Sequence, residues 1–83
     1  MINVLFFARL REQLNCEQLE LELNNKLLTI TDIKNKLIEL HPDWQAHFNN
    51  AALLVAVNQQ ISDNDTLIKN GDEVAFFPPV TGG

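Results

Sequence analysis

The residues best placed for chemistry are Gly82 and Gly83, which end the 83-residue sequence in an unhindered carboxylate. Neither glycine has a Cβ, so this end of the backbone can enter a slot too narrow for any other residue. The Gly83 carboxylate is therefore our candidate reactive group. A bare terminal Gly-Gly pair more often belongs to a disordered tail without function. The residues that precede the pair decide between a functional arm and such a tail.

The lead-in to the glycines favours a functional arm. It carries no charged side chain, whereas disordered tails are usually charged or polar. The strand predicted for residues 73–77 should stop there, because Pro78 and Pro79 cannot donate to a sheet. The proline pair favours an extended path through Val80 and Thr81. Six extended residues span roughly 20 Å, which is enough to carry the carboxylate well away from a folded body.

Other reactive side chains form no recognisable site. Cys16 has no basic residue or glycine turn beside it to activate the thiol. His41 and His47 are separated by a proline and have no cysteine partner, which is not a zinc spacing. The triplet at 63–65 begins like a calcium loop, but Ile68 stands where the loop needs glycine. No glycine-rich phosphate loop is present, so we expect no metal and no bound cofactor.

Composition indicates one small domain, with a folded body over residues 1–77 and a flexible arm over residues 78–83. The net charge of −5 argues against nucleic acid and favours basic protein partners. The single cysteine fits a reducing compartment, and no apolar run is long enough for a membrane span. We therefore expect a cytoplasmic protein that does not contact a membrane.

Alternating or continuous apolar residues predict strands, and helical spacing predicts the segments between them. A short helix is expected at 8–14, closed by Asn15, and one further helical turn is expected from Trp44 to Phe48. Gly71 supplies the positive φ that the turn before the last strand needs. Strands are expected at residues 2–7, 17–23, 53–58 and 73–77, with a short additional strand at Ile61.

The main helix should begin after Thr29, which is an N-cap residue with Asp32 in the capping-box position. Pro42 should stop it after roughly a dozen residues. Its apolar stripe is predicted to face the sheet and consists of Ile30, Ile33, Leu37 and Leu40. One such helix on one face of a mixed sheet is an α+β fold.

The first and last strands are the most apolar and should lie side by side at the centre of the sheet. Their second faces carry Leu5, Phe7, Ala75 and Phe77, and no second long helix is predicted to cover them. An uncovered apolar patch on a small protein usually marks a partner site. The alternative is that loops cover these side chains or that they form a satellite cluster.

Three segments resemble a known family: VLFFA at 4–8, VNQ at 57–59 and GDEVAFFPPVTGG at 71–83. They resemble the small, sulfur-carrier subunit of molybdopterin synthase. The similarity extends over the whole chain and is closest at its two ends. The closing stretch is the specific signature, and it shows no departure from the family pattern.

The resemblance implies a ubiquitin-like β-grasp fold: a mixed sheet of four to five strands, one main helix on one face and an extended C-terminal tail. It also implies that an ATP-dependent enzyme adenylates the Gly83 carboxylate and that sulfur from a sulfurtransferase donor then replaces AMP, giving a thiocarboxylate. The tail would insert into the large catalytic subunit and donate sulfur to cyclic pyranopterin monophosphate. Two transfers would build the dithiolene of molybdopterin.

On this resemblance the chain is not an enzyme by itself but the sulfur-donating subunit of a complex, expected to be a heterotetramer. Phe7, Ile61 and Phe77 match hydrophobic positions through which the family docks its partners. Two alternatives remain open. The chain could carry sulfur for thiamin thiazole or tRNA thiolation, or it could be a binding module or protein modifier whose tail forms isopeptide bonds.

Overall fold

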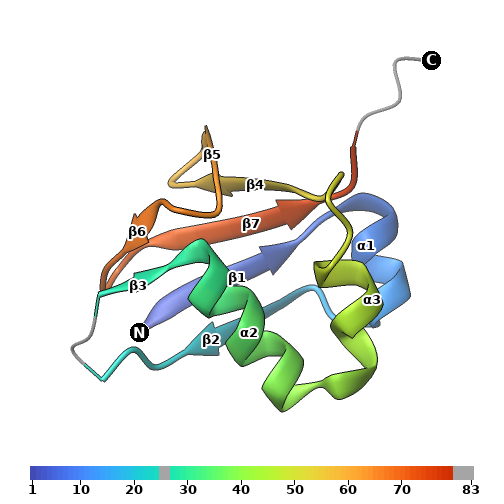
Figure 1. Ribbon diagram of the computed structural model, residues 1–83, viewed down its shortest axis with the longest axis horizontal. Helices are drawn as coiled ribbons and strands as arrows, with labels where there is room; N and C mark the ends of the chain where they lie inside the picture. The colour runs from blue at the N-terminus through green and yellow to red at the C-terminus, as the bar shows by residue number, and fades with distance from the viewer. Residues whose placement is uncertain (25–26, 80–83) are drawn as a thin grey trace.

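The computed structural model describes residues 1–24 and 27–79, and a five-stranded mixed sheet forms its centre (Figure 1). The sheet order is β2-β1-β7-β4-β5, so the first and last strands are neighbours, as the sequence predicts. They run parallel, whereas the other pairs in this sheet are antiparallel. The five strands are β1 (Ile2–Phe6), β2 (Gln18–Leu21), β4 (Leu54–Val57), β5 (Gln60–Ser62) and β7 (Glu73–Phe77).

Helix α2 (Ile30–Leu40) begins where the capping box places it. The Asp32 backbone N–H donates to Thr29 Oγ1, and the Thr29 N–H donates back to the Asp32 carboxylate. Ile30, Ile33 and Leu37 are fully buried against the sheet, as expected. The prediction for Leu40 was wrong, because it is 56% exposed in the last turn of the helix, where it lines an open hollow beside Leu23.

Two shorter helical segments close one end of the core. Helix α1 (Ala8–Leu14) ends at Asn15, which takes the left-handed conformation predicted for it, with φ of 52°. A 3-10 turn, η1 (Pro42–Trp44), leads directly into α3 (Gln45–Phe48). Trp44 and Phe48 are both buried, and each lies against Phe6 of β1 with centroid distances of 5.4 and 6.1 Å. The helical turn predicted from Trp44 to Phe48 is confirmed.

A second, two-stranded ladder was not predicted. Strands β3 (Leu28–Thr29) and β6 (Leu67–Ile68) pair antiparallel at the N-terminal end of α2. The apolar pair Leu67 and Ile68 predicts a return of the chain to the core; Ile68 is buried, but Leu67 is 61% exposed, so the prediction for Leu67 was wrong. Gly71 has the predicted positive φ, 91°. The sequence also predicts a turn at Asn24, Asn25 and Lys26, and only Asn24 of these lies within the described residues.

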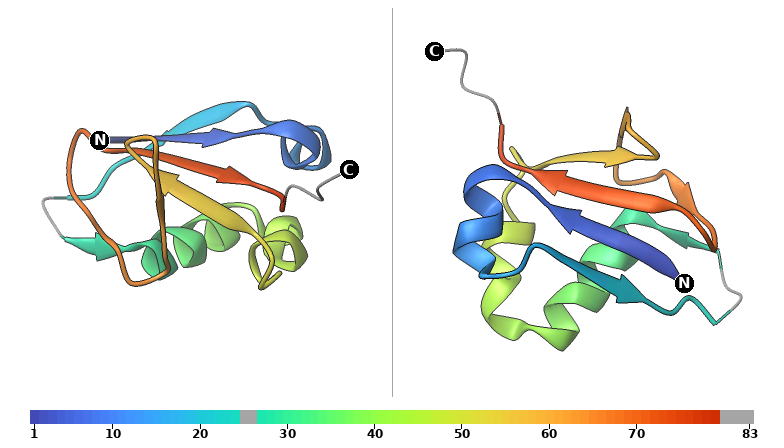
Figure 2. Two further views of the ribbon diagram at one scale, coloured as in Figure 1. Left: turned by 90° about the horizontal axis from the view of Figure 1, so that it is seen from above. Right: turned by 180° about the vertical axis from the view of Figure 1, so that it is seen from behind.

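Helices α2 and α3 lie on one side of the main sheet. From above, both lie below the strands of that sheet, and from behind, these strands lie in front of both helices (Figure 2). No helix in the described ranges covers the opposite side, which we call the outer face. None of the described helices has the length and apolar character needed to cross a bilayer.

Candidate functional site

The predicted site begins at the end of β7. This central strand ends at Phe77, as expected from the two prolines that follow. Pro78 is half-buried and Pro79 is exposed. The remaining predicted site residues lie outside the described part of the chain, so the extended path and the reactive carboxylate stay predictions. These residues are Val80, Thr81, Gly82 and Gly83.

The root of the arm, where β7 ends at Phe77, follows a residue that is packed into a buried aromatic cluster. Phe76, directly before Phe77, is fully buried and packs edge-on against Phe48 with a centroid distance of 5.2 Å. It also stacks on Phe6, at 6.3 Å and an interplanar angle of 16°. Aromatic contacts of this kind add roughly 0.5–1.5 kcal/mol each beyond area burial. The aromatic cluster therefore fixes the point from which the arm departs.

The predicted partner residues share the outer face. Leu5, Ala75, Ala56 and Ile61 lie opposite one another across four strands, and Phe77 lies opposite Leu54. Phe7, the next residue in the alternation of β1, is 45% exposed, and Ile61 is 70% exposed. We call these seven residues the apolar patch: Leu5, Phe7, Leu54, Ala56, Ile61, Ala75 and Phe77.

Small and large side chains are distributed unevenly in the patch. The two alanines occupy the middle of the row, with Leu5 at one end and Ile61 at the other. Both alanines are buried, although no described helix covers them, because a short side chain lies below its larger neighbours. An apolar side chain of a partner could therefore bury surface between Leu5 and Ile61.

An acidic row runs beside the apolar patch. Glu20 lies opposite Asn3, and Asn3 lies opposite Glu73 on the next strand. Asn3 and Glu73 lie two residues before Leu5 and Ala75 on their strands, so they share the outer face, and Glu20 shares it as the cross-strand partner of Asn3. The surface thus combines an apolar centre with an acidic border, which suits a partner with an apolar centre and basic rim.

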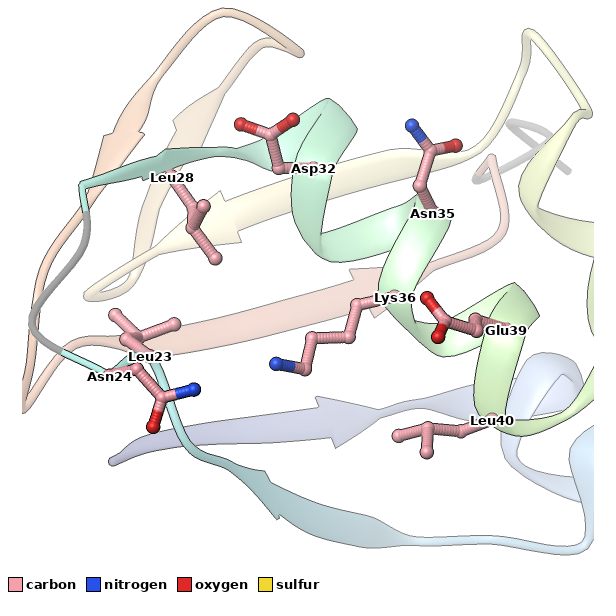
Figure 3. Close-up of a pocket in the computed structure, with 8 residues that line it drawn as sticks. All are labelled: Leu23, Asn24, Leu28, Asp32, Asn35, Lys36, Glu39 and Leu40. Atoms are coloured by element: carbon pink, nitrogen blue, oxygen red, sulfur yellow. The ribbon is translucent and has the colours of Figure 1, made fainter.

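A separate hollow of about 310 Å³ lies on the helix side, between α2 and the segment after β2 (Figure 3). The Lys36 side chain in it donates to the Glu22 carbonyl oxygen at 3.2 Å. Neither histidine nor cysteine is among the described residues that line it. The lining residues are Leu23, Asn24, Leu28, Asp32, Asn35, Lys36, Glu39 and Leu40.

The side chains excluded from catalysis on sequence have other roles. His41 caps the end of α2 and stacks on Trp44, with ring centroids 3.9 Å apart. The Cys16 thiol donates to the Gln18 carbonyl oxygen at 3.6 Å. Within residues 1–24 and 27–79, no cluster of three or more His, Cys, Asp or Glu side chains could hold a metal ion.

One polar feature escaped the sequence analysis. Asp72 is buried, and its carboxylate accepts hydrogen bonds from the Lys69 backbone N–H and the Asn58 amide, at 2.9 and 3.0 Å. Burial by itself would raise the pKa of Asp72. These two hydrogen bonds and the nearby Lys69 charge outweigh it, so the pKa lies below its ordinary value. The sequence showed only a turn aspartate and an asparagine at a strand end.

The family model described as "ThiS family" matches residues 4–83. The chain is 41% identical over 83 residues to the molybdopterin synthase sulfur carrier subunit of Haemophilus influenzae, covering 100% of both chains. It is 39% identical over 83 residues to the Escherichia coli protein of the same name, again covering 100% of both.

Solved structures show the same fold. SAMP1, a small archaeal modifier protein from Haloferax volcanii, superimposes with a TM-score of 0.82 at 25% identity, covering 99% of this chain and 98% of that one. A putative molybdopterin converting factor subunit 1 from Pyrococcus furiosus gives 0.76 at 27%, covering 95% and 97%. A Helicobacter pylori complex of subunits 1 and 2 of that factor gives 0.66 at 22%, covering 99% and 97%.

These likenesses and the sheet order define a ubiquitin-like β-grasp domain, so the predicted fold is confirmed. The terminal Gly-Gly falls within the family match. The chain belongs to the ThiS family and, within it, to the molybdopterin synthase sulfur carrier subunits.

Proposed function

We propose that the Gly83 carboxylate is the group that carries sulfur. A carboxylate is a poor electrophile, so an ATP-dependent enzyme would first convert it to an acyl-adenylate, with release of pyrophosphate. Sulfur supplied at the sulfide level by a sulfurtransferase donor then displaces AMP and leaves a thiocarboxylate, whose sulfur is a strong nucleophile at neutral pH. This sulfur attacks cyclic pyranopterin monophosphate, and water then cleaves its bond to the acyl carbon and restores the Gly83 carboxylate. Two such transfers build the dithiolene. The observation that supports this best is the full-length identity to named sulfur carrier subunits.

The body of the domain acts as a handle in this proposal and supplies no catalytic group of its own. Its partners are the adenylating enzyme and the large subunit of the synthase, which forms a heterotetramer with it. The Helicobacter pylori complex of subunits 1 and 2, which shares the fold, is consistent with a two-subunit assembly. ATP is used by the activating enzyme and is not a bound cofactor of this chain.

The apolar patch is the proposed docking surface for the large subunit. It lies on the strand that carries the arm and on both of that strand's neighbours, so docking and tail insertion can occur together. Phe7, Ile61 and Phe77 are its proposed main contacts. Burying exposed apolar surface contributes roughly 25 cal/mol per Å², which favours these side chains over the polar border.

Mass spectrometry of the intact chain tests the chemistry. After co-expression with the activating enzyme and sulfur donor, the chain should gain the mass difference between sulfur and oxygen. Deleting Gly83 should abolish this gain and sulfur transfer without changing the unfolding midpoint. A Leu40→Ala variant, altered on the helix side with an intact tail, is the control. Sulfur transfer by the shortened chain would refute the terminal-carboxylate mechanism.

A second function is protein modification, suggested by the fold shared with SAMP1. A modifier would form isopeptide bonds between Gly83 and lysines of other proteins. Higher-mass conjugates of the tagged chain in cell extracts would support it, whereas only free and thiolated forms would exclude it. Complementation of a molybdopterin-deficient strain separates a molybdopterin carrier from sulfur carriers for thiamin thiazole or tRNA thiolation.

A further inference from the structure

Asp72 is the only buried polar or charged side chain among the described residues, with 7% exposed. It lies directly before β7, the strand that carries the C-terminal arm. Burying a carboxylate costs free energy unless hydrogen bonds compensate for the lost hydration. The hydrogen-bond partners of Asp72 therefore indicate which parts of the chain it stabilises.

Those partners connect two separate turns. One Asp72 oxygen accepts from the Lys69 backbone N–H at 2.9 Å, which closes the turn before β7. The other accepts from the Asn58 side-chain amide at 3.0 Å. The Asn58 side-chain oxygen in turn accepts from the Glu73 backbone N–H at 3.0 Å, and the Asn58 N–H donates to the Glu73 carbonyl at 2.8 Å. Every polar atom of the Asn58 amide group is thus directed at the start of β7.

Asn58 is the first residue of the two-residue turn between β4 and β5. Both turn residues, Asn58 and Gln59, have positive φ, 50° and 69°, which is the geometry of a type I′ hairpin. Strand β5 is only three residues long and lies at the edge of the sheet, so β4 is its single strand neighbour. Its course therefore depends strongly on this turn. It carries Ile61, the most exposed member of the apolar patch.

We propose that the Asp72–Asn58 pair is a positioning element that holds Ile61 at a fixed place relative to the root of the C-terminal arm. The pair joins the hairpin that bears Ile61 to the strand that bears Phe77. The side chains of Ile61 and Phe77 therefore keep a fixed spacing when they contact the large subunit. This inference rests on the proposed docking surface. It assigns the pair a role in partner binding in addition to its contribution to folding.

Exchanging the two side chains tests the pair. In Asp72→Asn, the amide can accept only one of the two hydrogen bonds that the carboxylate accepts, and its NH2 group faces the NH2 group of Asn58. In Asn58→Asp, two carboxylates face each other. In the exchanged double variant every hydrogen bond can be rebuilt: Asn at 72 accepts from Lys69 N–H and donates to Asp at 58, which accepts from Glu73 N–H. The affinity of each chain for the purified large subunit is measured at a temperature well below the unfolding midpoint of that chain.

We expect each single variant to bind about 5- to 20-fold more weakly and the exchanged variant to recover to within about twofold of wild type. In an Ile61→Ala background, Asp72→Asn should cause little further loss, because the pair acts through Ile61. A full further loss in that background, or wild-type binding by both single variants, would overturn the inference while leaving the docking surface intact. Wild-type binding by Ile61→Ala alone would instead overturn the docking surface, and the inference with it.

Discussion

The backbone N–H of Phe7 donates to the carbonyl oxygen of Phe76 at 3.1 Å. This bond extends the β1–β7 pairing by one residue beyond β1 and places Phe7 beside the end of the strand that carries the arm. Phe7 also precedes α1, whose Arg11 N–H donates to the Phe7 carbonyl oxygen at 3.4 Å. Its backbone is thus fixed on both sides, while its side chain stays 45% exposed.

Replacing Phe7 with alanine should weaken large-subunit binding by about 10- to 30-fold, because an aromatic contact at the centre of an interface contributes about 1–2 kcal/mol or more. The unfolding midpoint should change little, because the ring is half outside the core. Calorimetric titration measures the affinity. Leu40→Ala removes an exposed apolar side chain on the helix side and should bind normally; equal losses in both variants would count against the patch.

Replacing Gly82 with alanine should slow thiocarboxylate formation and sulfur transfer by about 100-fold, since misplacing a reacting group by about 1 Å has effects of this size. The added Cβ would widen the arm where both partner enzymes must enclose it. Single-turnover assays with each partner measure the two steps. Thr81→Ser, which keeps the Cβ and its hydroxyl and removes only the γ-methyl group, is the control. Normal rates for Gly82→Ala would contradict the narrow-slot argument.

The main features of the fold follow from local sequence signals. Alternation identifies β1 and β7, and the Thr29–Asp32 capping box fixes the start of α2 within one residue. The partner face follows from the same alternation, because the second face of the central strands has no helix left to cover it. Strong local patterns of this kind do not depend on knowing the rest of the structure.

The features that were missed depend on pairing between distant segments. Strands β3 and β6 have two residues each, too few for any alternation, and pair across nearly forty residues. Leu40 continues the helical stripe, but it lines an open hollow and stays exposed. The Asp72–Asn58 hydrogen bond joins two turns, and an aspartate in a turn is exposed far more often than buried. Only the three-dimensional arrangement reveals these contacts.

Asp72 should contribute to the pH dependence of stability. Its pKa is lowered in the folded state, so its ionised form stabilises the fold at pH values above the ordinary carboxyl pKa, about 3.9. This contribution is lost as the pH falls through the lower, folded-state pKa. The difference in unfolding free energy between wild type and Asp72→Asn should therefore be constant from about pH 5 to about pH 7, which is one to three units above the ordinary carboxyl pKa. It should shrink as the pH falls below that ordinary pKa.

Urea unfolding of both chains across this pH range measures the difference. Glu39→Gln, which removes an exposed carboxylate near the end of α2, is measured alongside as the matched control. If the difference in unfolding free energy between wild type and Asp72→Asn instead grows as the pH falls, the sign of the pKa shift is contradicted.

Replacing Phe48 with alanine should lower the free energy of unfolding by about 3–5 kcal/mol, the usual range for a buried aromatic residue. The ring contacts both Phe6 and Phe76, so its loss leaves a cavity beneath the root of the arm. Phe48→Leu should cost less, because it fills more of this space. Denaturant unfolding gives both values. Equal costs for the two variants would contradict this explanation, because the volume that leucine restores would then contribute nothing.

The acidic border should control how fast the partner associates. Reversing the charge of Glu20, which lies opposite Asn3 on the outer face, should slow association with the large subunit by about 2- to 10-fold at low salt, since border charges mainly affect encounter rates. The dissociation rate should change little. Because exposed charges are screened, the difference should nearly vanish at about 0.5 M salt.

Stopped-flow association at several salt concentrations tests this expectation for Glu20→Lys. Glu39→Lys changes the net charge of the chain by the same amount but lies on the helix side, next to the hollow of Figure 3. If only the total charge of −5 steers the encounter, both variants will slow association equally. A larger effect of Glu20→Lys would locate the steering at the outer face, where the apolar patch must meet its partner.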